Sequence, residues 1–253
     1  AGILAGDIIY KVNDEEVWNK KIDTIAAKIR GQAGTKVKLT IVRNDKTHDF
    51  ELTREEINNV SADLSYDGKT AIIMVTRFDN DTGTIVQNFA KEFAEKGVDK
   101  VILDLRGNGG GYVSAARDLL SLWIDGQKIL VQRSKNNGEN TIYANRGQAI
   151  LANTKTVVLV NGTSASASEI VTGALQDHKK ATVVGEKTFG KGVVQTMLDL
   201  DAGAMLKVTT AHWYTPNGFS INHKGITPDK KVKRSFDDIN SDRDPQMDAA
   251  KKL

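Results

Sequence analysis

One stretch of the chain, VDKVILDL at residues 98–105, is almost continuously apolar. A run that lacks alternation of polar and apolar residues is typical of a strand buried on both faces of a sheet. Such a strand needs covering elements on each side, and the sequence from residue 56 onwards alternates expected strands with expected helices. This alternation predicts a layered α/β core.

The expected elements of this core share apolar patterns with strand or helix periodicity. They are strands at 70–76, 98–105, 154–161, 181–185, 193–200 and 206–214, and helices at 81–96, 113–123 and 164–177. We place the core at residues 56–240. Residues 241–253 are rich in Asp and Lys and are expected to form a polar tail exposed to solvent.

The first 55 residues have a different pattern, that of a small β-rich module. The expected strands are IIYKV, KVKLTIVR and HDFELTR. Between them, KIDTIAAKIR carries Ile22, Ile25 and Ile29 on one face of an expected helix, which GQAG ends. We therefore expect two domains, with the first at residues 1–55.

Composition excludes several classes of function. The 35 basic and 32 acidic residues are scattered and give a net charge of +3, which does not indicate binding to nucleic acid. No apolar run approaches the ~18 residues that a membrane-spanning helix needs. Cysteine is absent, and the four histidines lack the spacing of metal ligands. We expect no metal or cofactor.

A glycine-rich loop, DLRGNGGG at 104–111, follows the most apolar strand. Its glycines leave backbone amides unshielded and allow positive φ angles. Such a turn can bind an anion or form an oxyanion hole, although a flexible turn from strand to helix would have the same composition. A dinucleotide-binding fingerprint fits poorly, because Tyr112 stands where its third glycine is required.

A serine-rich loop, NGTSASASEI at 161–170, precedes the third expected helix, and Ser164, Ser166 and Ser168 alternate in it with alanines. A serine at a helix start lies near the positive end of the helix dipole, where a developing oxyanion is stabilised. These serines could instead act only as N-caps. An N-cap needs only one serine. The presence of three serines therefore favours the interpretation that one of them is a nucleophile. Glu169 is expected to be a helix-start carboxylate rather than a participant in the chemistry.

The third polar loop, GEKTFGKGVVQ at 185–195, places Lys191 between two glycines and between two apolar strands. Partial burial disfavours the ammonium form of a lysine, which is the condition for a lysine to act as a base. The alternative is a solvated surface charge. The loop also nearly matches a nucleotide-binding P-loop, but Gly192 stands where Ser or Thr should hold Mg²⁺, and a strand follows where a helix should.

Together these loops resemble successive motifs of the carboxyl-terminal processing peptidases, also called tail-specific proteases. The matching blocks cover most of the chain in the family's order: AGILAGDIIYKVNDEEV, GTKVKLTIVR, ILDLRGNGGG, VNGTSASASEIVTGALQD, VVGEKTFGKGVVQ and WYTPNGFSI…GITPD. The spacing agrees as well, with 25 positions from Ser166 to Lys191. The resemblance implies a ClpP/crotonase-like α/β protease core at 56–240, preceded at 1–55 by the carboxyl-terminal part of a PDZ domain.

The resemblance also assigns roles to residues. It implies that Ser166 is the nucleophile, that Lys191 is its general base and that Gln195 positions Lys191. It implies an oxyanion hole from the backbone amides of Gly110 and Ala167, with the neighbours of Gly110 as alternatives. A neutral lysine can accept the serine proton and return it to the leaving amine. A glutamine can orient that lysine without restoring its charge, as a carboxylate would.

Substrates and location follow from the same resemblance. PDZ domains bind extended peptides by adding them as a strand, so we expect endopeptidase cleavage of proteins near unstructured carboxyl termini through an acyl-enzyme. Homo-oligomerisation of the full-length protein is left open. Because the chain starts within the PDZ domain, we expect an upstream segment that anchors the protein in an extracytoplasmic place, the periplasm or cell envelope. A non-catalytic peptide-binding module is the alternative.

Overall fold

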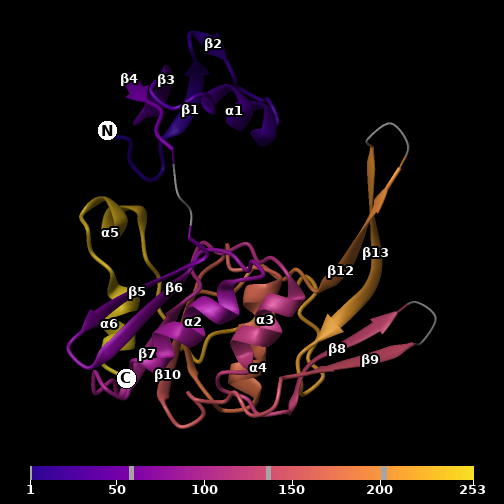
Figure 1. The fold of residues 1–253 in the computed structure, drawn as a ribbon. Helices are drawn as coiled ribbons and strands as arrows, with labels where there is room; N and C mark the ends of the chain where they lie inside the picture. Colours follow the sequence, from indigo (N-terminus) through magenta and orange to yellow (C-terminus); the bar gives the residue numbers. More distant parts are fainter. Residues whose placement is uncertain (1, 57–59, 135–137, 201–203) are drawn as a thin grey trace. The chain divides into compact units, whose positions relative to one another are not determined.

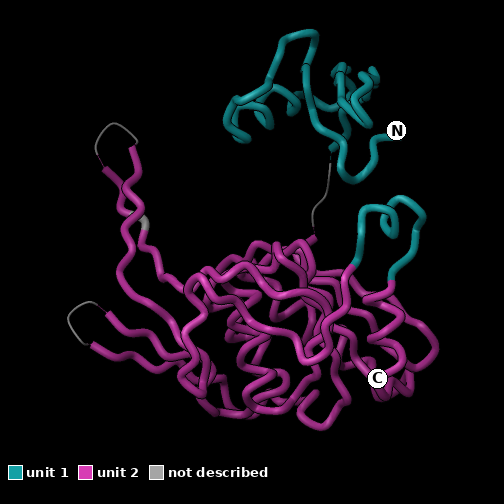
Figure 2. Tube along the Cα trace, turned by 180° about the vertical axis from the view of Figure 1, so that it is seen from behind, with its two compact units in different colours: residues 1–59, 234–244 teal, residues 60–233, 245–253 magenta. Residues whose placement is uncertain are grey.

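The structure is a computed structural model, and it describes residues 2–56, 60–134, 138–200 and 204–253. The chain divides into two compact units, which Figure 2 colours separately. Unit 1 comprises residues 1–59 and 234–244, and unit 2 comprises residues 60–233 and 245–253.

Unit 1 contains an antiparallel sheet and a helix that packs on it. In spatial order the strands are β2 (Glu15–Glu16), β1 (Ile8–Val12), β3 (Lys36–Arg43) and β4 (Lys46–Thr53), and the helix is α1 (Ile22–Ile29). Buried Val12, Val37 and Leu39 form a small core against Ile25 and Ile29 of α1. The three strands and the helix expected here are confirmed.

Unit 1 also includes residues 234–244, which the sequence analysis divided between the core and the polar tail. This segment contains α5 (Phe236–Asn240), and the Ser235 hydroxyl caps it by accepting from the Asp238 amide. The Ala5 amide donates to Asn240 Oδ1 at 3.0 Å, and Asn240 Nδ2 donates to the Ala5 carbonyl at 3.3 Å. Contacts between such distant parts of the chain leave no periodic signal in the sequence.

Unit 2 is built around a sheet that is parallel except at one edge. In spatial order its strands are β14 (Lys230–Lys231), β11 (Thr182–Gly185), β10 (Lys155–Val160), β7 (Lys100–Asp104), β6 (Thr70–Val75) and β5 (Ala62–Asp67). Only β5 pairs antiparallel with its neighbour in this sheet. The α/β fold class expected from the sequence is confirmed, as are the strands expected at 70–76, 98–105, 154–161 and 181–185.

Helices cover both faces of this sheet. On one face, α2 (Thr82–Lys91), α3 (Val113–Leu120) and α4 (Ala167–Asp177) lie side by side (Figure 1). Alternate residues of β7 divide between the faces: Val101 and Leu103 pack in the cluster with these helices, and Ile102 packs in the cluster with α6 (Pro245–Lys251). This two-sided burial explains the continuous apolar run.

The polar tail expected at residues 241–253 is wrong for its last part. Helix α6 occupies most of it, and Ala250 is fully buried against the sheet while Met247 packs on the same cluster. Its contact face consists mainly of small or flexible side chains, so charged residues dominate the local composition and hide the amphipathic pattern.

A second, antiparallel sheet borders this core. Its strands, in spatial order, are β12 (Val193–Asp199), β13 (Met205–Tyr214), β8 (Lys128–Ser134) and β9 (Glu139–Tyr143). The long hairpin of β12 and β13 extends away from the rest of unit 2 (Figure 1). At its base, Trp213 is buried in the main core cluster, which fixes the start of β12 beside the three polar loops.

Candidate active site

The three polar loops leave neighbouring strands at the same edge of the sheet. Strand β10 pairs in parallel with β7 on one side and with β11 on the other. The loops at 105–112, 161–166 and 186–192 therefore all emerge at the carboxyl edge, where layered α/β proteins place their ligand sites.

Two of the three serines in the second loop have structural partners. The Ser164 hydroxyl donates to the carbonyl of Leu105 at 2.8 Å, and the Ser168 hydroxyl donates to the carbonyl of Asn108 at 2.9 Å. Both bonds join the serine-rich loop to the glycine-rich loop. Ser166 is the N-cap of α4, and its side chain takes part in a capping box with the Glu169 amide. Within the described residues, however, its hydroxyl donates no hydrogen bond to the glycine-rich loop. The structure thus separates Ser166 from the other two serines.

Ser166 also has an unusual backbone conformation. It lies between strand β10 and helix α4 with φ 55° and ψ −115°. Positive φ angles are uncommon for a side chain with Cβ, and residues held in such regions cluster at functional sites. A sharp turn from strand to helix places the half-buried serine at its apex, a geometry that the nucleophile turn of α/β-hydrolases also has.

The buried carboxylate of Glu169 joins the serine turn to the lysine loop. Its Oε2 accepts from the amides of Ser166 at 3.0 Å and Lys191 at 2.8 Å. Its Oε1 accepts from the Thr188 hydroxyl at 2.6 Å and the Gly190 amide at 2.7 Å. One side chain therefore fixes the backbone of both residues that the sequence analysis selected.

The expectation that Glu169 is a helix-start carboxylate is confirmed, because it lies in the first turn of α4. Its contacts with the lysine loop were missed by sequence reasoning. The only local signal is its place three residues after Ser166, the spacing of a capping box, which says nothing about residues 188–191.

The backbone of Lys191 is fixed from two sides. Its amide donates to Glu169, and its carbonyl accepts from Trp213 Nε1 at 3.0 Å. A Cβ on Gly192 would lie 2.3 Å from the Asn222 amide nitrogen, so glycine is required next to the lysine. The side chain is half-buried, and its amine has no hydrogen-bond acceptor among the described residues.

Ser166, Lys191 and Gln195 line one cavity of about 170 Å³. The remaining lining residues are Gly111, Val113, Ile170, Val193, Val194, Lys207 and Trp213. A β-bulge between Val194 and Gln195 bends β12, which allows Gln195 to face the same space as Lys191. Gln195 Nε2 donates to Thr209 Oγ1 at 3.5 Å and makes no hydrogen bond to Lys191 in the described structure.

The glycine-rich loop lies directly against Ser166. A Cβ on Gly110, whose φ is +107°, would be 2.7 Å from Ser166 Cβ. The Gly110 amide donates to Asn108 Oδ1 at 2.8 Å, whereas the amides of Gly109, Gly111 and Ala167 have no acceptor among the described residues. Of the two unengaged glycines, Gly111 lines the cavity. Which of Gly109, Gly110 and Gly111 donates to the oxyanion stays a prediction.

Asn108 is a second residue that sequence reasoning missed. It is fully buried, and its Nδ2 donates to the Val75 carbonyl at 2.8 Å while its Oδ1 accepts from Gly110. Its own carbonyl accepts from the Ala165 amide at 3.0 Å as well as from Ser168. The sequence marks it only as the polar residue within a run of glycines.

Other kinds of site find less support. Over the described ranges, no group of three or more His, Asp or Glu side chains is arranged to hold a metal ion. No helix in those ranges is both long enough and apolar enough to span a bilayer. The near match to a P-loop leads into strand β12, so Lys191 does not open a helix as a P-loop lysine does.

Comparison with family models agrees with the two-part organisation. The model described as Peptidase family S41 matches residues 69–232, which include all three loops. A model described as a PDZ domain matches residues 1–43.

Individual relatives extend over nearly the whole chain. The "Probable CtpA-like serine proteases" of Staphylococcus saprophyticus and Staphylococcus aureus strain N315 are 38% and 39% identical to it, each over 92% of this chain. These matches cover 48% and 47% of the relatives, so the chain spans about half the length of the curated relatives it matches.

Solved structures share the fold. A photosystem II D1 C-terminal processing protease matches with a TM-score of 0.75 and 28% identity, over 92% of this chain and 64% of that one. Mature CPAF matches with a TM-score of 0.60 at 13% identity, over 94% of this chain and 74% of that one, which is a likeness of fold alone.

Proposed function

The chain belongs to peptidase family S41, which confirms the resemblance drawn from its sequence, and from this premise we propose that it hydrolyses peptide bonds with Ser166 as nucleophile and Lys191 as general base. One observation carries the proposal. Of the three serines in the loop, Ser166 is the one whose hydroxyl donates no hydrogen bond to the glycine-rich loop in the described chain, and it lines the same cavity as Lys191.

In the proposed first step, the neutral amine of Lys191 removes the proton of the Ser166 hydroxyl while the oxygen attacks the scissile carbonyl carbon. The carbonyl oxygen becomes an oxyanion. The Ala167 amide and one glycine amide of the loop at 109–111 are free to donate to it. Collapse of this intermediate breaks the C–N bond, and Lys191 returns the proton to the leaving amine.

The second step repeats this chemistry with water. Lys191 takes a proton from water as the oxygen attacks the acyl carbon, and the new intermediate collapses to a carboxylic acid while Ser166 recovers its proton. Gln195 lines the same cavity as Lys191 and would position its amine when substrate is bound. Catalytic hydrogen bonds often form only in the complex with substrate.

Glu169 supports this proposal as a positioning residue. A catalytic pair must be held in its productive geometry, and displacements near 1 Å can cost ~100-fold in rate. Since one buried carboxylate accepts from the amides of both Ser166 and Lys191, it restricts how far the two loops can separate.

The proposed substrates are proteins with unstructured carboxyl termini. The support is the PDZ match at residues 1–43, because PDZ domains capture extended peptides, together with the likeness to a photosystem II D1 C-terminal processing protease. We extend the proposal to an extracytoplasmic location and leave assembly into homo-oligomers open.

Cleavage of casein, a disordered protein, tests the assignment. Ser166→Ala and Lys191→Ala should each lower the rate by at least about 1,000-fold, because each removes a group that handles the same proton. Lys155→Ala is the matched control, since Lys155 is an exposed lysine outside this cavity, and it should cleave at the unaltered rate. Near-normal turnover by either catalytic variant would overturn the assignment.

A further inference from the structure

A second cavity, of about 700 Å³, adjoins the loops that carry Ser166 and Lys191. We call it the basic cavity. Its lining residues are Gly162, Gly185, Glu186, Lys187, Thr227, Lys231, Val232 and Lys233. Gly162 lies four residues before Ser166, and Lys187 lies four residues before Lys191. The cavity shares none of its lining residues with the one that contains the proposed catalytic pair.

The lining carries three lysines against one glutamate, an excess of two positive charges. Lys231 ends β14 and Lys233 follows two positions later, and both line the same cavity. None of the three lysine amines has an ion-pair or hydrogen-bond partner in the described part of the chain. By contrast, Lys251 pairs with Asp67 at 2.7 Å on the same unit.

Backbone donors add to this charge. The amides of Gly162 and Lys187 have no acceptor among the described residues. A Cβ placed on Gly162 would meet only the Lys187 carbonyl, at 3.9 Å, so this part of the wall is open. Unpaired amides beside lysines favour a ligand that accepts hydrogen bonds and bears negative charge.

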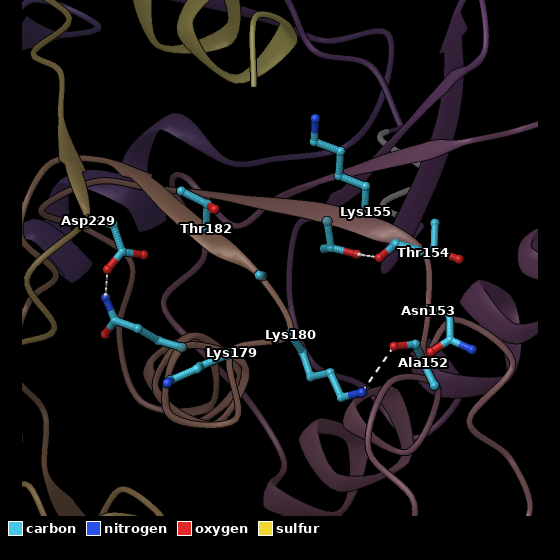
Figure 3. A pocket seen from close by; sticks show the side chains of 11 residues that line it. Ala152, Asn153, Thr154, Lys155, Lys179, Lys180, Thr182 and Asp229 are labelled. Atoms are coloured by element: carbon cyan, nitrogen blue, oxygen red, sulfur yellow. Dashed lines mark hydrogen bonds between the residues drawn. The ribbon is translucent and has the colours of Figure 1, made fainter.

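A cavity at the opposite edge of the sheet shows why lysines alone are insufficient (Figure 3). It is lined by Lys155, Lys179 and Lys180 but also by Asp229. The Lys180 amine already donates to the Ala152 carbonyl at 3.0 Å, as Figure 3 shows. This cavity also lies at the carboxyl end of α4, where the helix dipole repels anions.

We propose that the basic cavity binds a carboxylate of the peptide substrate, carried by a residue outside the scissile bond. This proposal rests on the proposed function, because Gly162 and Lys187 of the cavity lining belong to the same loops as Ser166 and Lys191. The lysine stems and Val232 give it apolar walls, and the amines supply the charge, which suits an acidic side chain on an extended chain. The site would add a preference for acidic residues near the cleaved bond.

Peptide binding to the Ser166→Ala chain tests the proposal without hydrolysis. The probes are two fluorescein-labelled, amidated peptides rich in Ala and Val that differ only in having Glu or Gln at the same positions. Fluorescence anisotropy should show roughly tenfold tighter binding of the Glu peptide, because several exposed charge contacts add up. The triple variant Lys187→Gln/Lys231→Gln/Lys233→Gln should lose this preference.

The matched control is Lys155→Gln/Lys179→Gln, which removes two exposed lysines from the cavity of Figure 3. It should keep the preference for the Glu peptide. Equal loss in both variants would overturn the proposal, since only a general charge effect would then remain. Lys231→Glu/Lys233→Glu should reverse the preference toward a peptide with Lys at the same positions.

A free carboxyl terminus could supply the same chemistry. The Gln peptide as free acid distinguishes the two sources: tighter binding than its amide, abolished by the triple variant, would assign the cavity to the terminal carboxylate. If the Ser166→Ala chain bound the Glu peptide, the amidated Gln peptide and the Gln peptide as free acid equally, the proposal would be overturned. Casein cleavage by the chain with Ser166 intact separates the outcomes, because cleavage without a carboxylate preference rejects only the basic cavity.

Discussion

The two edges of the same parallel sheet use polar residues in different ways. At the carboxyl edge, polar side chains such as Asn108, Ser164 and Glu169 are fully buried and bond across the three loops. At the amino edge, Lys180 and Gln176 are only half-buried, and their bonds to Ala152 and Asp229 join surface segments.

The difference distinguishes the proposed catalytic pair from its surroundings. A buried polar group destabilises the fold unless it is hydrogen-bonded, so the partnered side chains at the carboxyl edge hold the loops in one arrangement. In the described structure, the Ser166 hydroxyl donates no hydrogen bond to these loops and the Lys191 amine has no acceptor, and both residues line one cavity. We therefore expect substitutions at the carboxyl edge to reduce activity and stability together, and those at the amino edge to spare activity.

The largest effect outside the proposed catalytic pair is expected for Glu169→Gln. An amide in its place can accept with only one of its two terminal atoms, which leaves buried donors of the lysine loop unpaired at a cost of about 2–4 kcal/mol. We expect kcat on casein to fall about 100-fold with little change in KM, because the two loops separate. Urea unfolding and steady-state kinetics measure the two effects.

Asp177→Asn is the control for Glu169→Gln. It makes the same chemical change at the other end of α4, where Asp177 accepts one bond from the Asn217 amide at 2.7 Å. Its kcat should match that of the unaltered chain. Equal losses of kcat from both variants would remove the distinction between the two edges.

The next largest effect is expected for Gly110→Ala. The added Cβ would meet Ser166 Cβ at 2.7 Å and the Ala165 carbonyl at 2.8 Å, so the serine turn must shift. We expect a loss of activity of about 30- to 100-fold. Gly107→Ala imposes a similar backbone strain, at φ +75°, but its Cβ would meet nothing within 4 Å. If the two variants lose stability alike but only Gly110→Ala loses activity, contact with Ser166 is the cause.

A smaller effect is expected for Ser168→Ala. This change removes one buried bond to the Asn108 carbonyl, which should cost about 1 kcal/mol in the free energy of unfolding. Activity should fall by less than about tenfold, because Asn108 keeps its other bonds. A loss as large as that of Ser166→Ala would contradict the structural role given to Ser168.

The smallest effect is expected at the amino edge. Lys180→Met removes the amine that donates to Ala152 while keeping the apolar stem, so we expect about 0.5 kcal/mol of destabilisation and unchanged casein cleavage. A measurable drop in kcat would show that the amino edge also influences the site.

The sequence predicted the elements whose pattern is set by their own surroundings. The apolar run of β7 required burial on both faces, and the alternation in KVKLTIVR required a sheet with one exposed face. It did not predict β5, an edge strand with several exposed polar residues, nor α6, whose buried face depends on Ala249 and Ala250. Strand β5 is set by its pairing with β6, the next strand along the chain, whereas α6 packs on β10 and β11, which lie far away in sequence.

The site was predictable to the same extent. Glycine-, serine- and lysine-containing loops after consecutive strands indicated where chemistry would lie, and the structure brings Ser166, Lys191 and Gln195 to one cavity. The hydrogen bond from the Lys191 amide to Glu169 was not predictable, because it depends on β10 and β11 being neighbours in the sheet. Likewise, the sequence could not show that the Gly110 amide is engaged by Asn108.

The central claim is that Ser166 is reactive because Lys191 can take its proton. Labelling with a hydroxyl-directed peptidyl phosphonate, followed by mass-spectrometric mapping, tests it most directly. We predict a single modified serine, Ser166, in the unaltered chain, and loss of that label in Lys191→Ala with the fold retained. Labelling of Ser164 or Ser168 instead, or undiminished labelling of Ser166 in Lys191→Ala, would contradict the account.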